Sequence, residues 1–162
     1  MRFIFRVLLV LGFAMSMAGV VSADTAVEAT KKPVIQVFYK EKAPSLETLD
    51  QVLKFLVDYE DTYEIEKVII TDPANSELLT KMKLPAEHFP FALAIEGKTS
   101  ARIGEATIIF AHFPDFMHKI GRHQGNWTLE HLRQVLQNRS LLLPDNPEVT
   151  TAPGGQDGKK PE

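Results

Sequence analysis

Between residues 33 and 137 the chain alternates short apolar segments with amphipathic ones, and this order restricts the folds that it can adopt. Four runs rich in β-branched and aromatic residues predict strands, at 34–39, 64–70, 91–95 and 99–103. Three runs with leucines at helical spacing or with capping residues at their start predict helices, at about 44–59, 74–82 and 128–137. The order strand, helix, strand, helix, strand, strand, helix predicts an α/β domain.

The third predicted strand has a proline before it and a turn after it. Phe89-Pro90 leads into the apolar run 91–95, and Glu96-Gly97-Lys98 leads out of it. The run 68–78, Val-Ile-Ile-Thr-Asp-Pro-Ala-Asn-Ser-Glu-Leu, ends a strand in acidic, Asn and Pro residues before a helix. With the element order, these runs resemble the thioredoxin-like superfamily over residues 33–137. The resemblance implies a thioredoxin-like fold with a central mixed sheet flanked by helices, and a cis peptide bond before Pro90.

The chain contains no cysteine, although thioredoxins carry a Cys-x-x-Cys pair after the first strand. Ala43 and Leu46 stand nearest to the positions of that pair. Because a thiolate is the nucleophile of disulfide exchange, this chain cannot perform that reaction. Ser45 has a hydroxyl at the start of the first predicted helix, where we expect it to serve as a helix cap. The sequence predicts no catalytic residue and no cofactor.

The surface on which thioredoxin-like domains hold extended peptides does not require cysteines. The resemblance therefore implies a redox-inactive protein that binds a protein or peptide partner by strand-like pairing beside the proline. The residues expected to form this surface are Lys40, Lys42, Ala43, Pro44, Ser45, His88, Phe89 and Pro90.

An insertion at about 104–127 separates the fourth strand from the last helix and is longer than the usual connection. Gly104-Glu105 can turn the chain into an additional strand at 107–111, and 114–120 can form a short helix. Its aromatic content suits a satellite core or a partner surface. The residues expected on that surface are Phe113, Phe116, Met117 and Trp127.

Three histidines in the insertion suggest an alternative function, that of a metal-binding accessory protein. His112, His118 and His123 offer imidazole, a common ligand of zinc and copper. Their spacing matches no known ligand motif, so solvated or hydrogen-bonded loop residues are the simpler interpretation. Asn126-Trp127-Thr128 fits the N-glycosylation sequon, and equally allows Asn126 or Thr128 to cap the last helix, which we prefer.

Residues 1–23 have the features of a secretory signal peptide. Arg2 and Arg6 precede the apolar stretch 7–20, which is shorter than the roughly 20 residues that span a bilayer, and Val21-Ser22-Ala23 fits a cleavage site. We therefore expect a periplasmic or secreted protein with no stable membrane anchor after cleavage near Ala23. Loss of the two arginines changes the formal net charge from −3 to −5. That balance argues against nucleic acid as a partner.

Two polar segments are expected to flank the folded part. Residues 24–32 predict a flexible leader, and residues 144–162, with hardly any large apolar side chain, predict a disordered tail. These boundaries leave 33–143 as a single domain.

Overall fold

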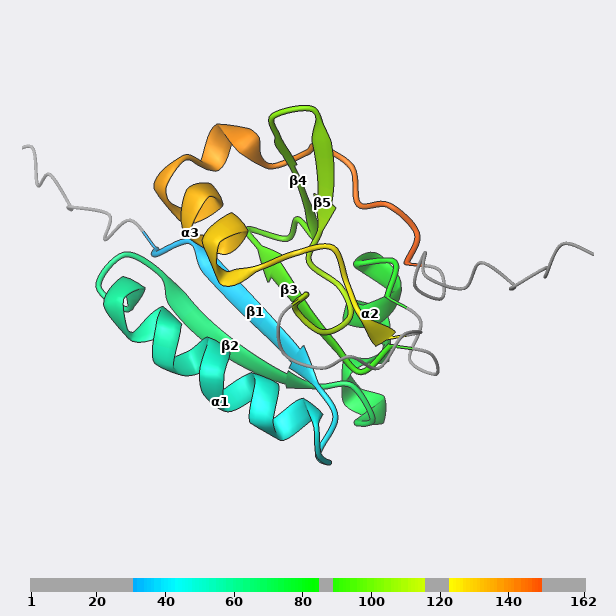
Figure 1. Ribbon diagram of the computed structural model, residues 1–162. Coiled ribbons are helices and arrows are strands. Elements are labelled where there is room, and N and C mark those ends of the chain that lie inside the picture. Colours follow the sequence, from blue (N-terminus) through cyan, green and yellow to red (C-terminus); the bar gives the residue numbers. More distant parts are fainter. Residues whose placement is uncertain (1–30, 85–88, 116–122, 150–162) are drawn as a thin grey trace, which may run out of the picture. The chain divides into compact units, whose positions relative to one another are not determined.

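A three-stranded mixed sheet forms the centre of the computed structural model, which describes residues 31–84, 89–115 and 123–149 (Figure 1). The strands β1 (Val34–Tyr39), β2 (Glu64–Ile69) and β3 (Phe91–Ile95) lie in the order β2-β1-β3. β1 is parallel to β2 and antiparallel to β3, and Tyr39 lies opposite Phe91. The mixed α/β architecture expected from the element order is therefore present.

Helices cover both faces of this sheet. Alternate side chains of β1 and β3, such as Val37 and Leu93, pack against α1 (Ser45–Leu56) and α3 (Leu129–Gln137). The remaining side chains, such as Phe38 and Ala92, pack with Leu79 of the short helix α2 (Ser76–Lys81). The strand alternation of inward and outward side chains thus builds two apolar clusters, one on each face.

The predicted elements agree with the structure within a few residues. β1 and β3 have the predicted bounds. The second helix is divided into a 3₁₀ turn (η2, Pro73–Asn75) and α2, and the Asp72 carboxylate caps the turn by accepting a hydrogen bond from Ala74 N. Two further 3₁₀ turns, η1 (Val57–Tyr59) and η4 (Arg139–Leu141), follow α1 and α3. No helix in the described ranges has the length and apolar composition to span a membrane.

The fourth strand, β4, does not join the central sheet. β4 (Ser100–Ile103) pairs with β5 (Ala106–Ile109) in a separate antiparallel hairpin. Residues after β5 lie along β3 instead, because Leu93 N donates to Phe110 O and Ala92 bridges to Ala111. The additional strand expected at 107–111 is thus β5 together with this bridging segment.

The segment after residue 143 is packed on the domain, which corrects the prediction that disorder begins at 144. The Asn146 side chain accepts a hydrogen bond of 2.9 Å from Thr99 N and donates one of 3.0 Å to Gly97 O. Val149 is 8% exposed and belongs to the α2-side apolar cluster. These contacts satisfy backbone groups of the β3–β4 turn, so the described segment to residue 149 is part of the fold.

Candidate functional site

The loop between β1 and α1 lies against the start of β3. Ser45 Oγ accepts a 2.9 Å hydrogen bond from Lys40 N and donates one of 2.7 Å to the carbonyl of Pro90. The Ser45 side chain is buried, and its hydroxyl is used for this connection. It is therefore not the helix cap that we expected: α1 begins at Ser45, and its N-cap residue Pro44 makes no side-chain cap.

The cis peptide bond among the described residues is at Ala43–Pro44 and not at Phe89–Pro90. The expectation of a cis bond before Pro90 is therefore wrong. A trans bond is the ordinary state of an X–Pro pair, favoured by about 0.5–1 kcal/mol. In this geometry Pro90 directs its carbonyl to the Ser45 hydroxyl.

The residues expected to bind a partner are brought together only in part. Lys42 and Ala43 are exposed, whereas Lys40, Pro44 and Pro90 are partly buried. Phe89 is 1% exposed and belongs to the apolar cluster beside α2, which corrects its expected position on the binding surface. His88 lies outside the described residues.

Lys40 has an altered electrostatic environment at this loop. Partial burial lowers the pKa of its ammonium group below the ordinary value, and the positive charge of Lys42 lowers it further. Lys42 N donates a 2.8 Å hydrogen bond to Lys40 O, so the two lysines are neighbours in the loop that follows β1, whose last residue Tyr39 lies opposite Phe91.

The aromatic residues of the insertion belong to the main core. Phe113 and Trp127 are at most 1% exposed, which corrects their expected position on a partner surface. Trp127 stacks on Phe91 with ring centroids 6.2 Å apart and meets Phe110 edge-on at 5.8 Å. Large aromatic rings stabilise the fold most when they are fully buried, which explains this placement. Phe116, Met117 and the predicted helix 114–120, apart from Pro114 and Asp115, lie outside the described residues.

Two of the three histidines considered as metal ligands are neighbours. The rings of His112 and His123 stack with centroids 6.3 Å apart, and Phe113 N donates to His123 O. His118 lies outside the described residues, and the described ranges hold no group of three side chains suited to a metal ion. The metal site remains a prediction.

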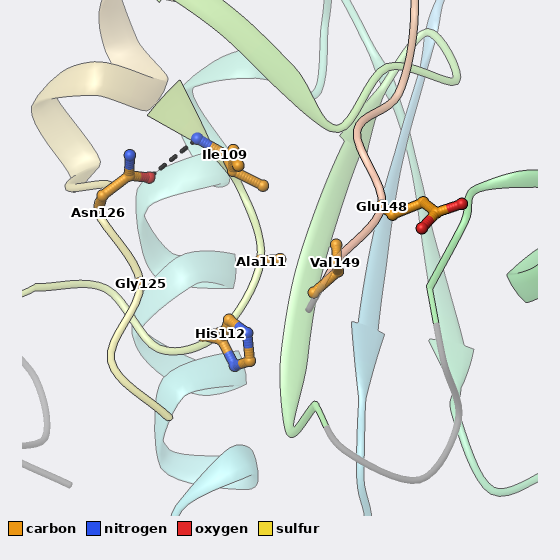
Figure 2. A pocket seen from close by; sticks show the side chains of 7 residues that line it. All are labelled: Ile109, Ala111, His112, Gly125, Asn126, Glu148 and Val149. Atoms are coloured by element: carbon orange, nitrogen blue, oxygen red, sulfur yellow. Dashed lines mark hydrogen bonds between the residues drawn. The ribbon is translucent and has the colours of Figure 1, made fainter. Parts of the chain in front are cut away.

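His112 also borders a hollow of about 220 Å³ between β5, the strand-like residues after it and the C-terminal segment (Figure 2). Its backbone has a φ of +64°, and Trp127 Nε1 donates a 3.1 Å hydrogen bond to its carbonyl. The hollow is lined by Ile109, Ala111, His112, Gly125, Asn126, Glu148 and Val149.

Gly125 allows the two sides of this hollow to approach each other. A Cβ at this position would lie 2.3 Å from the carbonyl oxygen of Ala111, a distance that no side chain tolerates. The sequence offered little indication of this hollow, because its members come from three separated stretches of chain. The single valine of the polar tail, Val149, was the weak signal available.

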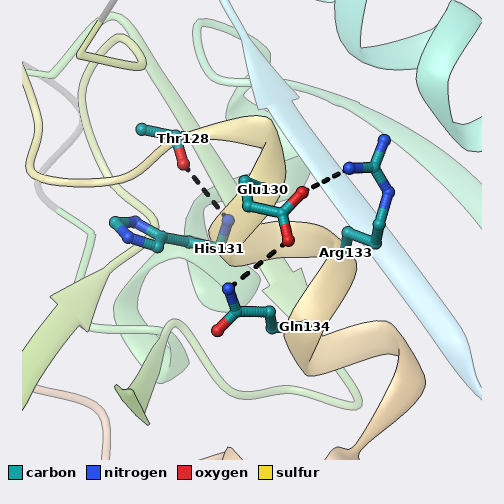
Figure 3. A network of polar contacts seen from close by, with 5 residues as sticks. All are labelled: Thr128, Glu130, His131, Arg133 and Gln134. Atoms are coloured by element: carbon teal, nitrogen blue, oxygen red, sulfur yellow. Dashed lines mark hydrogen bonds and ion pairs between the residues drawn. The ribbon is translucent and has the colours of Figure 1, made fainter. Parts of the chain in front are cut away.

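Asn126, which lies just before α3, forms two side-chain hydrogen bonds to the backbone of β5 beside the hollow. Asn126 Oδ1 accepts from Ile109 N at 2.9 Å, and its Nδ2 donates to Thr107 O at 2.8 Å. Of the two residues expected as the cap of the last helix, Thr128 caps α3 by accepting a hydrogen bond from His131 N (Figure 3). Glu130 in the first turn pairs with Arg133 and accepts from Gln134.

The chain matches no family model, no curated protein and no solved structure.

Proposed function

We propose that this chain is an exported, thioredoxin-like protein without redox activity that binds an extended segment of a partner protein beside Pro90. Two features of the described fold support the thioredoxin-like part of the proposal. The central sheet is mixed, and helices flank both of its faces. The separate β4–β5 hairpin and the trans bond at Pro90 are departures from the expected pattern.

The observation that carries the proposal is the hydrogen bond from Ser45 Oγ to Pro90 O. In thioredoxins, the start of the first helix faces the proline before the third strand of this core, and cysteines stand at that helix start. Here the start of α1 contacts Pro90 through the hydroxyl of Ser45, and no cysteine is present. This contact supports the proposal that a thioredoxin-like scaffold is kept here without its nucleophile.

Binding rather than catalysis follows from the groups that line this region. Lys42 and Ala43 are exposed in the loop that precedes Ser45, whose hydroxyl contacts the partly buried Pro90, and the sequence provides no thiolate. An extended peptide can pair with backbone groups at a strand end without any catalytic side chain.

A randomised peptide library displayed on phage tests the binding surface. We expect enriched peptides whose binding is lost in Ala43→Arg, which places a long charged side chain on the exposed loop. The matched control is Ala74→Arg, because Ala74 is an exposed alanine in η2. Enrichment of no sequence, or equal loss in both variants, would contradict the proposed site.

Two further measurements test the remaining parts of the proposal. The purified chain should not reduce insulin disulfides, and detectable reduction would overturn the redox-inactive assignment. N-terminal sequencing of the protein from the exporting organism should begin at Asp24, and an intact Met1 would overturn export by cleavage.

The stacked pair His112 and His123 favours metal binding as a second candidate function. Two adjacent imidazoles could supply half of a tetrahedral zinc site. Calorimetry with Cu²⁺ and with Zn²⁺ on tag-free protein tests this candidate, and His118→Ala should weaken binding at least tenfold. Absence of micromolar binding of either metal would exclude it.

A further inference from the structure

The outer edge of β2 is a strand edge that the rest of the described fold leaves open. The central sheet has the order β2-β1-β3, so β1 pairs with one side of β2 (Figure 1). The outer side of β3 is bridged at Ala111, β4 is bridged at Leu142, and β5 is hydrogen-bonded by Asn126. Within residues 31–84, 89–115 and 123–149, no strand or bridge pairs with the outer side of β2.

Two residues of β2 direct their backbone groups to this open side. Glu64 N donates a 2.9 Å hydrogen bond to the carbonyl that precedes β1, so the even-numbered residues of β2 face β1 in the parallel pairing. Because the backbone groups alternate sides along a strand, Ile65 and Lys67 direct their N–H and C=O groups outward. The next outward carbonyl, that of Ile69, accepts from Asn75 Nδ2 at 2.9 Å. The open part of the edge is therefore Ile65 and Lys67.

A groove of about 340 Å³ lies between α1 and this edge. Leu53, Val57 and Ile65 form its apolar walls, and charged side chains complete its lining: Asp50, Lys54, Glu60 and Lys67. Val57 is 58% exposed, and only Val57 and Leu46 are exposed large apolar side chains in the described part of the chain. In a neighbouring strand, the side chain opposite Ile65 would stand about 5 Å from it, which is inside the mouth of this groove.

The carboxylate of Glu64 gives the edge its charge on the other face of the sheet. Glu64 is exposed and lines neither this groove nor the hollow on its own face. Glu66 accepts a 3.0 Å hydrogen bond from Gln36. Glu66 also shares that hollow with three lysines, Lys31, Lys32 and Lys81. These lysines balance the charge of Glu66, although the ammonium of Lys32 itself donates to the backbone carbonyl of Glu60. A basic side chain is therefore favoured most strongly opposite Glu64.

The same charges oppose pairing of β2 with a second copy of the chain. A two-fold pair of copies would place the strands antiparallel, and Ile65 and Lys67 of one copy would have to meet Ile65 or Lys67 of the other. Pairing Lys67 with Lys67 opposes two lysines, pairing Ile65 with Ile65 places Glu64 opposite Glu66, and pairing Ile65 with Lys67 places Glu66 opposite Glu66. Like charges directly opposite each other destabilise a strand pair.

We propose that β2 is a second interaction site, which receives an extended segment of a partner protein with a basic-apolar-basic sequence as an added strand. The apolar side chain lies opposite Ile65 in the groove with Val57, and a basic neighbour lies opposite Glu64. Hydrogen bonds to the backbone of Ile65 and Lys67 hold the segment, and the side chains select it. This inference goes beyond the proposed function and does not depend on it, because β1 separates β2 from β3 and Pro90.

Amide hydrogen exchange of the full chain, followed by nuclear magnetic resonance, tests whether the edge is open. We expect the amides of Ile65 and Lys67 to exchange about tenfold faster, or more, than those of Glu66 and Val68, which face β1. Slow exchange of all four amides in a monomer would mean that another segment of the chain covers β2, and in a dimer that a second copy does. Either result would overturn the inference.

A synthetic peptide tests the chemistry of the added strand. The probe is the acetylated and amidated heptapeptide Thr-Lys-Val-Lys-Val-Lys-Thr. One matched peptide has glutamates in place of the lysines, and the other has prolines in place of the valines, because proline has no N–H to pair. We expect the probe to slow the exchange of Ile65 and Lys67 and to bind about tenfold more tightly than either matched peptide. Equal binding of the probe and the proline peptide would show attraction by charge alone and overturn the added strand.

Two pairs of substitutions test the side chains that select the segment. Glu64→Gln should weaken binding of the probe about threefold, and Glu105→Gln, at another exposed carboxylate outside β2, should not. Val57→Ser should weaken it about fivefold through lost apolar contact, and Leu46→Ser, at the other exposed large apolar side chain, should not. Equal effects within a pair would contradict the role of Glu64 or of Val57.

Discussion

Ser45 and Pro90 are 45 positions apart in the chain, and the hydroxyl of one donates a 2.7 Å hydrogen bond to the carbonyl of the other. The same hydroxyl accepts from Lys40 N. One buried side chain thus fixes the end of β1, the start of α1 and the entry to β3 with respect to one another. The geometry of the proposed binding site depends on this one oxygen atom.

Ser45→Ala should destabilise the protein by about 1–3 kcal/mol, because it leaves a partly buried carbonyl and a partly buried backbone N–H without their partner. Urea denaturation followed by circular dichroism measures the change in the free energy of unfolding. Ser76→Ala is the control, since Ser76 is an exposed serine at the start of α2, and its replacement should change the free energy by no more than about 0.5 kcal/mol. A similar small change for Ser45→Ala would show that the bridge contributes little.

The packed segment 144–149 makes a prediction about shortened chains. A chain that ends at residue 143 loses the Asn146 contacts with Thr99 and Gly97 and the burial of Val149. We expect it to be less stable by about 2–4 kcal/mol than a chain that ends at 149, from one buried valine and two hydrogen bonds. Thermal unfolding of the two chains measures the difference. Equal melting temperatures would show that the segment is dispensable.

The stability of the fold should decrease in alkaline solution because of Tyr63. Burial raises the pKa of its hydroxyl above the ordinary value of 10.0, and the hydroxyl donates a 3.2 Å hydrogen bond to Leu136 O. As the pH rises above about 10, the unfolded chain loses this proton first, so the free energy of unfolding falls until the pH exceeds the folded pKa. Denaturation curves between pH 8 and pH 11 measure this slope.

Tyr63→Phe is the test of that assignment. It should cost about 1 kcal/mol at neutral pH through the lost hydrogen bond, and it should reduce the alkaline slope. Tyr39→Phe is the control, because Tyr39 is a partly buried tyrosine on β1 and is not one of the groups that shift the pKa of Tyr63. If the free energy of unfolding of Tyr63→Phe decreases with pH as steeply as that of the unchanged protein, groups other than Tyr63 cause the loss of stability.

Lys40 should be acylated at a lower pH than an ordinary lysine. Partial burial and the charge of Lys42 lower the pKa of Lys40, so more of its amine is neutral and nucleophilic in mildly alkaline solution. Lys42→Gln should raise the pKa of Lys40 and slow its reaction with acetic anhydride, followed by peptide mass spectrometry. Lys54→Gln, an exposed lysine on α1, should leave the rate unchanged. No difference between the two variants would exclude the influence of Lys42.

The parts of the fold that the sequence predicted are those determined by local pattern. β3 is apolar throughout and ends at a turn in which Glu96 and Gly97 both have positive φ, so its bounds could be read directly. The Thr128 cap was recognisable in the same way, because a cap depends on residues within one helical turn.

The parts that could not be predicted depend on contacts between distant segments. Ser45 has the residue type and position of a helix cap, and only the arrival of Pro90 assigns its hydroxyl to another partner. Asn146 lies in a polar stretch whose composition is typical of disorder, yet its side chain matches the two backbone groups left by the β3–β4 turn. Composition does not encode such a match, since it depends on three-dimensional geometry.

The contacts of Asn126 have a consequence for self-association. Its side-chain amide has the same donor and acceptor as a peptide group, and it occupies Ile109 N and Thr107 O, where a further strand would bind β5. A strand edge with unpaired backbone groups is a template for aggregation, and native proteins block such edges. Asn126 therefore acts as a one-residue imitation of a neighbouring strand, and its replacement by alanine would open β5 to pairing between copies of the chain.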